Sequence, residues 1–296
     1  WKPLGFHLCL FSQEEDLMSI LSRSKSRPST AAATSDTLPF SKIWRLMLPK
    51  LGVSYVFVML LSVFNRVMIN ELKIAATLVG LMYLTYNIMN IFQVVNGRLA
   101  DRRTWFGLRR TPLMIFGLML SALSLLPLPY AALSFAQGNT MAFGAMLLCM
   151  AGFGLGFAVN GDSQNTLIAE LTEGKRNRPG VVSAVWLFQL VAIVASGIAT
   201  SIVLQVAETA AGAPKDCVTD ACRAIKSQVA IDLMPRLFLA GPIVCIVGLL
   251  PVLGLEKRLT ADQARAAQVR QPLNLRDAYT RIFKNEQTRV FFFFIV

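Results

Sequence analysis

Long apolar stretches separated by short polar links dominate this chain. Each stretch is close to the roughly 20 helical residues that cross the hydrocarbon core of a bilayer. The pattern predicts six membrane-spanning helices and the start of a seventh. The predicted spans cover residues 47–70, 77–98, 111–133, 140–169, 179–206 and 230–254. The chain is therefore predicted to be an all-α polytopic membrane protein.

The predicted spans divide the chain into four parts. We expect a cytoplasmic N-terminal leader, a bundle of six transmembrane helices, a central cytoplasmic linker and the truncated start of a seventh transmembrane helix. These parts cover residues 1–46, 47–254, 255–288 and 289–296. The chain begins with Trp and ends inside an apolar run, which favours a piece of a longer protein.

Composition and charge agree with a membrane protein. Charged residues make up 16% of the chain, against roughly 25% in an ordinary soluble domain. The net charge of +12 does not indicate a nucleic-acid partner, because the basic residues form no basic face with interleaved aromatic residues. They fall in alternate links between the spans. Lys and Arg favour the cytoplasmic side, which places the N-terminus and the basic links in the cytoplasm.

Polar residues inside the apolar stretches are candidate sites, because a buried polar group in lipid must find a partner or line a cavity. The second predicted span carries Tyr83, Tyr86, Asn87, Asn90, Gln93 and Asn96. Their spacing follows a helical period, so we expect one polar face that looks into the bundle. Two interpretations stay open: the face forms hydrogen bonds between helices, or it is the wall of a ligand site.

The fourth predicted span combines small residues with a polar end. Gly152 and Gly156 are four residues apart, which allows another helix to approach closely. Asp162 is the one acidic residue that lies within a predicted span and away from its ends. It can face a water-filled vestibule, take part in a substrate or proton site, or anchor a neighbouring helix. The polar candidates of this span are Asn160, Asp162, Gln164 and Asn165.

Arginine and cysteine residues near the outer side complete the candidates. Arg66, close to the outer end of the first span, is expected to snorkel to the membrane interface rather than to bind a ligand. Cys217 and Cys222 lie in the predicted external loop, where a disulfide can form if the compartment is oxidising. A metal site is not expected there, because no histidine or third cysteine lies nearby.

No set of residues typical of a catalytic site is present in the sequence. The single histidine, His7, lies in the leader. The glycines of the fourth span lie in an apolar helix with no preceding strand, so they are not a dinucleotide-binding motif. The sequence therefore predicts that the protein is not an enzyme.

Three short stretches resemble a known family of membrane proteins. The link between the second and third spans is similar to the loop between helices 2 and 3 of the major facilitator superfamily, although it is longer than in typical sugar or drug transporters. Its motif residues are Gly97, Asp101, Arg102, Gly107, Arg109 and Arg110. This longer form, with residues 65–72 and 165–171, is similar to the bacteriochlorophyll-delivery (PucC-type) family, which assists assembly of light-harvesting complexes.

The resemblance implies a fold, a membrane and a set of partners. The fold would be the N-terminal six-helix half of a major facilitator protein, followed by the central linker and the start of helix 7. The membrane would be the bacterial inner (photosynthetic) membrane. The partners would be light-harvesting antenna polypeptides or the reaction-centre complex, together with membrane lipid. The Asp101 carboxylate could accept backbone hydrogen bonds at a helix end, and the arginines could bind acidic helix ends or anionic lipid.

Two functions follow from this comparison. In the first, the protein is an assembly or (bacterio)chlorophyll-delivery factor, and the polar residues of the second and fourth spans face pigment or a partner. Bacteriochlorophyll or chlorophyll would then be bound weakly or transiently, because the spans contain no histidine to hold its magnesium. In the second, the protein is an alternating-access transporter of a small solute, with proton coupling through Asp162.

Overall fold

The computed structural model describes residues 37–93, 95–97, 105, 107–213, 220–256, 258, 280 and 284. Most of the predicted leader and linker and the predicted seventh span lie outside these residues. Asp101, Arg102 and Cys217 also lie outside them.

The regular elements of the described residues are helices. They are α2 (Phe40–Met47), α3 (Pro49–Val58), α4 (Ala76–Met89), α6 (Thr111–Ser124), α7 (Leu128–Ala136), α8 (Met141–Leu171), α9 (Arg178–Ala210) and α10 (Asp220–Leu249). Five segments are long and apolar enough to cross a membrane. These are Phe40–Glu71, Thr111–Ala136, Met141–Leu171, Arg178–Ala210 and Asp220–Val252. For the described residues, the prediction of a helical protein with several helices long and apolar enough to cross a membrane is confirmed.

The first of these segments begins at Phe40, inside the predicted leader. Pro49 separates α2 from α3, because proline has no backbone N–H to continue the helical hydrogen bonds. Arg45 of α2 donates hydrogen bonds to the carbonyl oxygens of Pro251 (2.5 Å) and Leu253 (2.8 Å), beyond the end of α10. Residues 40–46 are therefore part of the helical bundle.

The same segment contains two π-helical turns, η1 (Met59–Phe64) and η2 (Val67–Glu71). In a π-helix each backbone N–H donates to the carbonyl five residues back, and single turns of this kind occur frequently at functional sites. The half of this segment that ends at Glu71 is therefore wider than a regular α-helix.

The second predicted span is interrupted rather than continuous. The structure ends α4 at Met89, places a turn at Asn90 and Ile91 and returns to helix at residues 92–93 and 95–97, whereas the pattern predicts one helix as far as residue 98. The Asn87 amide donates to the carbonyl oxygen of Tyr83 (2.8 Å), and the Asn90 N–H donates to the carbonyl oxygen of Asn87, three residues back (3.1 Å). Asparagine side chains compete with the backbone for hydrogen bonds, which accounts for the tightened end of α4.

The third predicted span consists of two helices. Pro127 follows the end of α6 and directly precedes α7, so residues 111–133 do not form one regular helix. The last described helix, α10, begins at Asp220 rather than at residue 230. The first turns of α10 were not predicted as helix, because charged residues such as Arg223 interrupt the apolar pattern there.

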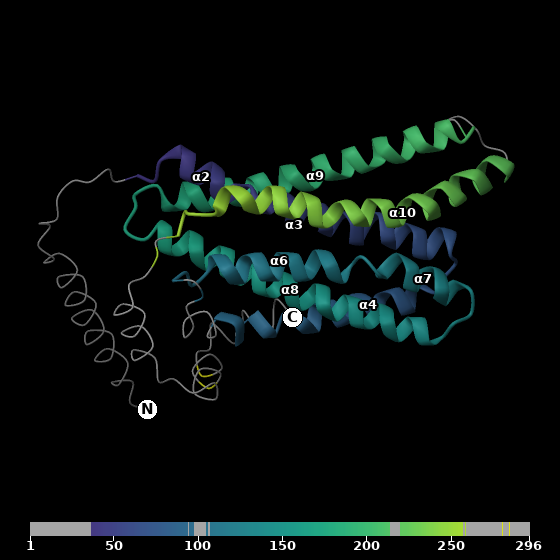
Figure 1. Ribbon diagram of the computed structural model, residues 1–296, viewed down its shortest axis with the longest axis horizontal. Helices are drawn as coiled ribbons and strands as arrows, with labels where there is room; N and C mark the ends of the chain where they lie inside the picture. The colour runs from purple at the N-terminus through teal and green to yellow at the C-terminus, as the bar shows by residue number, and fades with distance from the viewer. Residues whose placement is uncertain are drawn as a thin grey trace, which may run out of the picture. The chain divides into compact units, whose positions relative to one another are not determined.

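The helices form two groups (Figure 1). One contains α3 packed against α9 and α10, and the other contains α8 packed against α4, α6 and α7. Contacts between α10 and α6 join the groups. The buried side chains include Phe64, Met68, Met114, Met146, Met150 and Phe153. Methionine is flexible enough to fill the irregular gaps between such helices.

Small residues bring α8 close to its neighbours. A Cβ atom on Gly156 would lie 2.5 Å from the carbonyl oxygen of Gly117 on α6, and one on Gly154 would lie 2.6 Å from the carbonyl oxygen of Tyr86 on α4. Both distances are too short for any side chain. The close helix approach predicted from Gly152 and Gly156 is confirmed.

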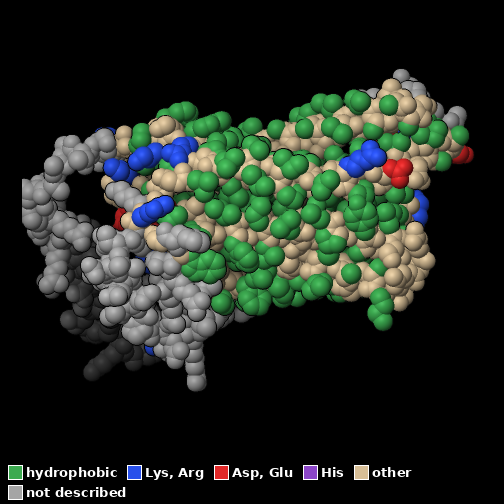
Figure 2. Space-filling view, in the orientation of Figure 1, with side chains coloured by type: hydrophobic (Ala, Val, Ile, Leu, Met, Phe, Trp, Pro, Cys, Tyr) green, Lys and Arg blue, Asp and Glu red, His purple; other side chains and the backbone are tan. Residues whose placement is uncertain are grey.

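Hydrophobic side chains cover the middle of the visible face, and Lys and Arg gather toward its two ends (Figure 2). Exposed apolar residues follow α9 in particular. Leu187, Leu190, Val194 and Ile198 are each more than half exposed. Such a continuous apolar surface suits contact with lipid rather than with water.

Candidate functional site

The candidate site lies at the end of the bundle where the first turn of α6, the end of α8 and the segment after α10 meet. We call this the basic end. A turn leads into it: the Trp105 N–H donates to the Leu108 carbonyl oxygen (2.8 Å), and the Leu108 N–H donates to the Trp105 carbonyl oxygen (3.0 Å). Gly107 has φ +76°, a backbone conformation that favours glycine. The turn delivers Arg109 and Arg110 to the start of α6.

Glu256 caps the start of α6 at the basic end. Its Oε1 accepts hydrogen bonds from the backbone N–H groups of Arg109 (2.6 Å) and Arg110 (3.0 Å). Its Oε2 accepts from both the backbone N–H (2.8 Å) and the hydroxyl (2.7 Å) of Thr111. The first N–H groups of a helix have no partner inside the helix and carry a partial positive charge. One carboxylate therefore satisfies several of these donors and ties the segment after α10 to the basic link.

Arg110 connects this cap to α8. Its Nε donates to Oε1 of Glu170 at 3.1 Å. The Arg110 side chain is only 6% exposed, whereas that of Glu170 is 40% exposed. A buried arginine is stable only when its donors are paired, so Arg110 holds the end of α8 beside the start of α6. Motif residues Arg109 and Arg110 thus take part in a network among three helical segments.

The network also contains a residue that the sequence analysis missed. Glu256 follows the last apolar span directly and was counted only as part of the linker. Two features of the sequence could have indicated this role. Glu256 is an acidic residue just after a predicted span, and the span predicted at 111–133 begins with a helix N-terminus, which favours a negative charge.

Asp162 contacts the segment that follows α4. Its Oδ2 accepts a hydrogen bond from Nδ2 of Asn96 (3.1 Å), and the same Nδ2 lies 3.4 Å from the carbonyl oxygen of Val159. A Cβ atom on Gly97 would lie 3.4 Å from Oδ2 of Asp162. Of the three roles open to Asp162, this geometry favours the anchor for a neighbouring helix.

The other polar residues of α8 also connect helices. Nδ2 of Asn160 donates to the carbonyl oxygen of Met114 on α6, and Nε2 of Gln164 donates to the carbonyl oxygen of Leu46 on α2, each at 3.1 Å. Asn160 and Gln164 are buried, whereas Asn165 is exposed. For the two buried residues, the interpretation as interhelical hydrogen bonds is the one that the structure favours.

The predicted polar face of the second span is divided in the structure. Tyr83 is half-buried, and its hydroxyl donates to the carbonyl oxygen of Leu60 at 2.9 Å, which joins α4 to the first span. Oδ1 of Asn90 is enclosed and has no hydrogen-bond partner. Asn87 and Gln93 are exposed. These two side chains therefore do not look into the described bundle. Asn87 lies on the exposed face of α4, and Gln93 follows the turn at Asn90 and Ile91, which changes the register of the residues after it.

A buried lysine lies on α3. Lys50 is 4% exposed, and its ammonium nitrogen lies 4.6 Å from the centre of the Trp186 ring on α9. This cation–π contact offsets part of the cost of burying the charge. The sequence analysis did not single out Lys50, although a lone lysine between two apolar runs is a recognisable signal.

The cysteine prediction concerns the opposite end of the bundle. Cys222 is buried near the start of α10 and is disulfide-bonded. Cys217 lies outside the described residues, so its pairing with Cys222 stays a prediction. Within the part of the chain that the structure describes, no group of three His, Cys, Asp or Glu residues could hold a metal ion.

Comparison with known proteins identifies similar sequences. A family model described as "PUCC protein" matches residues 63–296. The chain is 28% identical to the "Uncharacterized protein in puhA-bchM intergenic region" of Rhodobacter capsulatus, over 54% of the chain and 35% of that protein. It is 28% identical to "Protein PucC" of Cereibacter sphaeroides, over 57% of the chain and 38% of that protein.

A third relative has a different kind of name. The "Bacteriochlorophyll synthase 44.5 kDa chain" of Rhodobacter capsulatus is 28% identical over 53% of the chain and 36% of its own length. The matched region thus covers little more than a third of each of these relatives. No solved structure matches the chain.

Proposed function

The chain belongs to the PUCC protein family, and from this premise we propose that it is a membrane-embedded assembly or (bacterio)chlorophyll-delivery factor for photosynthetic light-harvesting complexes. The family match over residues 63–296 is the observation that carries the proposal. The absence of a catalytic set from the sequence supports a role that is not enzymatic. The chain spans little more than a third of its relatives in these alignments, so the activity is proposed for the whole protein.

The hydrogen bonds inside the bundle support this proposal. Asn160, Gln164 and Tyr83 each donate to a backbone carbonyl on another helix. A polar group that already has a partner gains little by binding a solute. These residues brace the helices, which favours a protein that works through its surface over a carrier with a polar interior.

The described residues do not fit a permanently bound tetrapyrrole. Oδ1 of Asn90 is an oxygen of the kind that magnesium prefers, but it is enclosed by neighbouring atoms. No histidine lies among the described residues. We therefore propose that any pigment is held weakly or transiently, and that contact with an antenna polypeptide or the reaction-centre complex is the main interaction.

The exposed face of α4 and the residues after it are the proposed contact surface. Leu84, Ile88 and Ile91 are 52%, 47% and 59% exposed. Asn87 and Gln93 are exposed among them. Apolar area with a few polar groups suits a membrane-embedded protein partner, because the apolar area packs while the polar groups fix the register.

We further propose that the helices form the N-terminal six-helix half of a major facilitator fold in the bacterial inner (photosynthetic) membrane, with the N-terminus in the cytoplasm. The five long apolar segments, with the shorter α4 as a sixth helix, support this arrangement. The basic residues of the links support the orientation.

The test is purification of the full-length protein from native phototrophic membranes in mild detergent. We expect antenna polypeptides or reaction-centre subunits to elute with it, together with a near-infrared pigment band. Replacing both Asn87 and Gln93 by leucine should reduce the eluted partner severalfold while the protein still accumulates. The matched control is Gln228→Leu, because Gln228 is also exposed and bonds only within its own helix.

Transport of a small solute is the alternative outcome of the same experiment. A colourless protein that elutes alone, together with normal antenna levels in a deletion strain, would contradict the assembly proposal and favour transport. If partners elute with the double variant as they do with the wild type, the assembly role stands and the α4 surface is excluded.

A further inference from the structure

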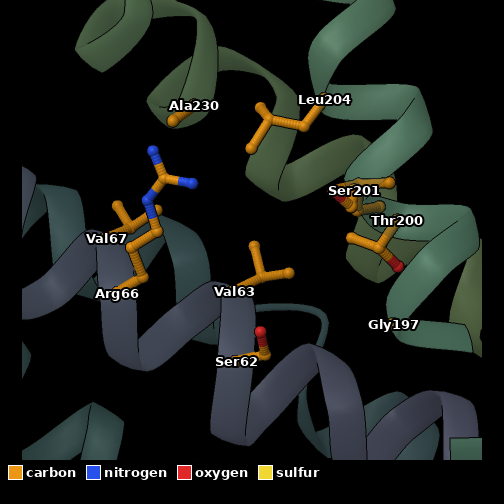
Figure 3. Close-up of a pocket in the computed structure, with 10 residues that line it drawn as sticks. Ser62, Val63, Arg66, Val67, Gly197, Thr200, Ser201, Leu204 and Ala230 are labelled. Carbon is orange, nitrogen blue, oxygen red and sulfur yellow. The ribbon is translucent and has the colours of Figure 1, made fainter. Parts of the chain in front are cut away.

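A cavity of about 160 Å³ lies between the first membrane-crossing segment, α9 and α10 (Figure 3). Ser62 and Arg66 line it from the first segment, Gly197, Thr200 and Ser201 from α9, and Ala230 from α10. These residues lie in the half of the bundle opposite the basic end, because they are close to Glu71, Ala210 and Asp220. The cavity is therefore separate from the network around Glu256.

Arg66 extends its side chain into this space. In Figure 3 its guanidinium group points from the first segment toward Ala230. No hydrogen bond or ion pair involves this side chain in the described part of the chain. An arginine within an apolar span is costly unless it meets water or an anionic partner. Arg66 is exposed, so its side chain is open to water or to an anion from outside the described residues.

Two hydroxyl groups add donors to the same cavity. The Ser201 hydroxyl oxygen accepts a hydrogen bond from Nε2 of Gln205 (3.2 Å), which leaves its own hydrogen available. Ser62 forms no hydrogen bond to the described residues through its side chain. Thr200 already donates to the carbonyl oxygen of Ser196 (2.8 Å). The cavity thus combines one cation with two available donors.

The lining of the cavity favours an anion. Among the described residues that line it, Arg66 is charged and none is acidic. One helical turn beyond the lining residues the charges are of both signs: Lys226 precedes Ala230 on α10, and Glu208 follows Leu204 on α9. Ser62 and Arg66 lie within or next to the π-helical turns η1 and η2, whose irregular backbone shapes this wall.

Size and depth narrow the class of ligand. A volume of about 160 Å³ is well above the roughly 10 to 15 Å³ that holds one water molecule. It is enough for a phosphate group and well below the roughly 300 Å³ at which pockets for drug-sized molecules begin. Arg66 lies five residues before Glu71, where the apolar segment ends. A lipid headgroup can therefore reach the cavity, because a membrane-crossing segment ends near the membrane interface.

We propose that this cavity binds the phosphate group of a membrane phospholipid, with Arg66, Ser62 and Ser201 as hydrogen-bond donors. The guanidinium fork matches two phosphate oxygens at once. Ile198 and Ile202 of α9 are 56% and 55% exposed beside Gly197 and Ser201, and they offer an apolar surface for the acyl chains. In this proposal the Arg66 side chain binds a ligand in the cavity, whereas the sequence alone predicted only that it extends to the membrane interface. The proposal does not depend on the assembly role.

The test is lipid binding by the full-length protein, measured by native mass spectrometry after delipidation in neutral detergent. The probes are phosphatidylglycerol, diacylglycerol and inorganic phosphate. We expect phosphatidylglycerol to bind and diacylglycerol not to bind. Arg66→Gln should weaken binding of phosphatidylglycerol about tenfold. Arg236→Gln is the matched control, because Arg236 is exposed on α10 and does not line the cavity.

Unchanged binding of phosphatidylglycerol by Arg66→Gln, or equal binding of diacylglycerol, would overturn the proposal. Binding of inorganic phosphate that depends on Arg66, without binding of phosphatidylglycerol, would keep the phosphate site and overturn the lipid as its source.

A second pair of variants keeps the test informative if Arg66→Gln fails to fold. Gly197→Leu fills the cavity and keeps the arginine, and a Cβ atom at Gly197 meets nothing within 4 Å. It should also weaken binding of phosphatidylglycerol about tenfold. Gly180→Leu is its control, because Gly180 lies on the same helix, has equally open space and does not line the cavity. Equal binding by both glycine variants would contradict the proposal.

Discussion

Oε2 of Glu256 accepts hydrogen bonds from both the backbone N–H and the hydroxyl of Thr111, at 2.8 Å and 2.7 Å. A residue beyond the end of α10 thereby caps the first turn of α6. The two positions are 145 residues apart in the chain. The start of α6 is therefore held by another part of the bundle.

Glu256→Gln should destabilise the protein. The variant keeps one oxygen acceptor but loses the negative charge that faces the partial positive charge of the helix start, at a cost of about 1 to 2 kcal/mol. Thermal unfolding of the detergent-solubilised protein measures the change. Glu173→Gln is the control, because Glu173 is exposed and its side chain forms no hydrogen bond or ion pair with the described residues. Equal unfolding temperatures for both variants would contradict the role of Glu256 as a cap.

Gly156→Ala should separate α6 from α8. The added carbon would lie 2.5 Å from the carbonyl oxygen of Gly117, so the helices must move apart at a cost of about 1 to 3 kcal/mol. Gly161→Ala on the same helix is the matched control, because its Cβ atom would meet nothing within 4 Å. The unfolding midpoint in denaturant compares the two. A similar loss in both would show that helix contact is not the cause.

Asn96 and Asp162 should be energetically coupled. Single replacements by valine and the double replacement form a cycle, and residues in direct contact typically show a coupling of about 0.5 to 3 kcal/mol. Asn165→Val provides the reference for a polar residue of α8 that is exposed. Additive effects of the two replacements would mean that Asp162 does not anchor the segment after α4.

Cys217 and Cys222 should resist alkylation until the protein is reduced. Cys222 is disulfide-bonded, and a closed bridge has no thiol to react. Mass spectrometry of the labelled protein checks both positions, and the free thiol of the half-buried Cys149 serves as the internal reference. Equal labelling of Cys217 before and after reduction would rule out the predicted pairing.

The basic links should lie in the cytoplasm. Reporter fusions at residues 104 and 175 should give a cytoplasmic signal, and a fusion at residue 215 should give an external one, because Lys and Arg favour the cytoplasmic side. A reversed pattern would contradict the orientation that the proposed fold requires.

Local periodicity and spacing were sufficient to predict much of the bundle. α8 and α9 begin and end within a few residues of the predicted spans, because each is a long stretch, apolar over most of its length, between polar links. Gly152 and Gly156 predicted a close approach by another helix, and the structure identifies that helix as α6. Both features depend only on residues close together in the sequence.

Features that depend on distant residues were not predicted. The sequence does not show that Glu256 lies at the start of α6 or that Gln164 bonds to the Leu46 carbonyl, because both contacts arise from packing. Asn87 and Gln93, expected on an inward face of the second span, are exposed in the described bundle, and the turn at Asn90 and Ile91 that precedes Gln93 was not predicted. The first turns of α10 were not predicted, because their charged residues interrupt the apolar pattern.

The position of Glu256 in the chain also determines when the cap of α6 can form during biosynthesis. Ribosomes add about 5 to 20 residues per second, so the 145 residues between Thr111 and Glu256 take about 7 to 30 seconds to make. During that interval the start of α6 has no cap, and Arg109 and Arg110 lack the carboxylate that later fixes their backbone. The start of α6 is thus capped only after α10 has left the ribosome, which makes the cap a marker of an inserted α10.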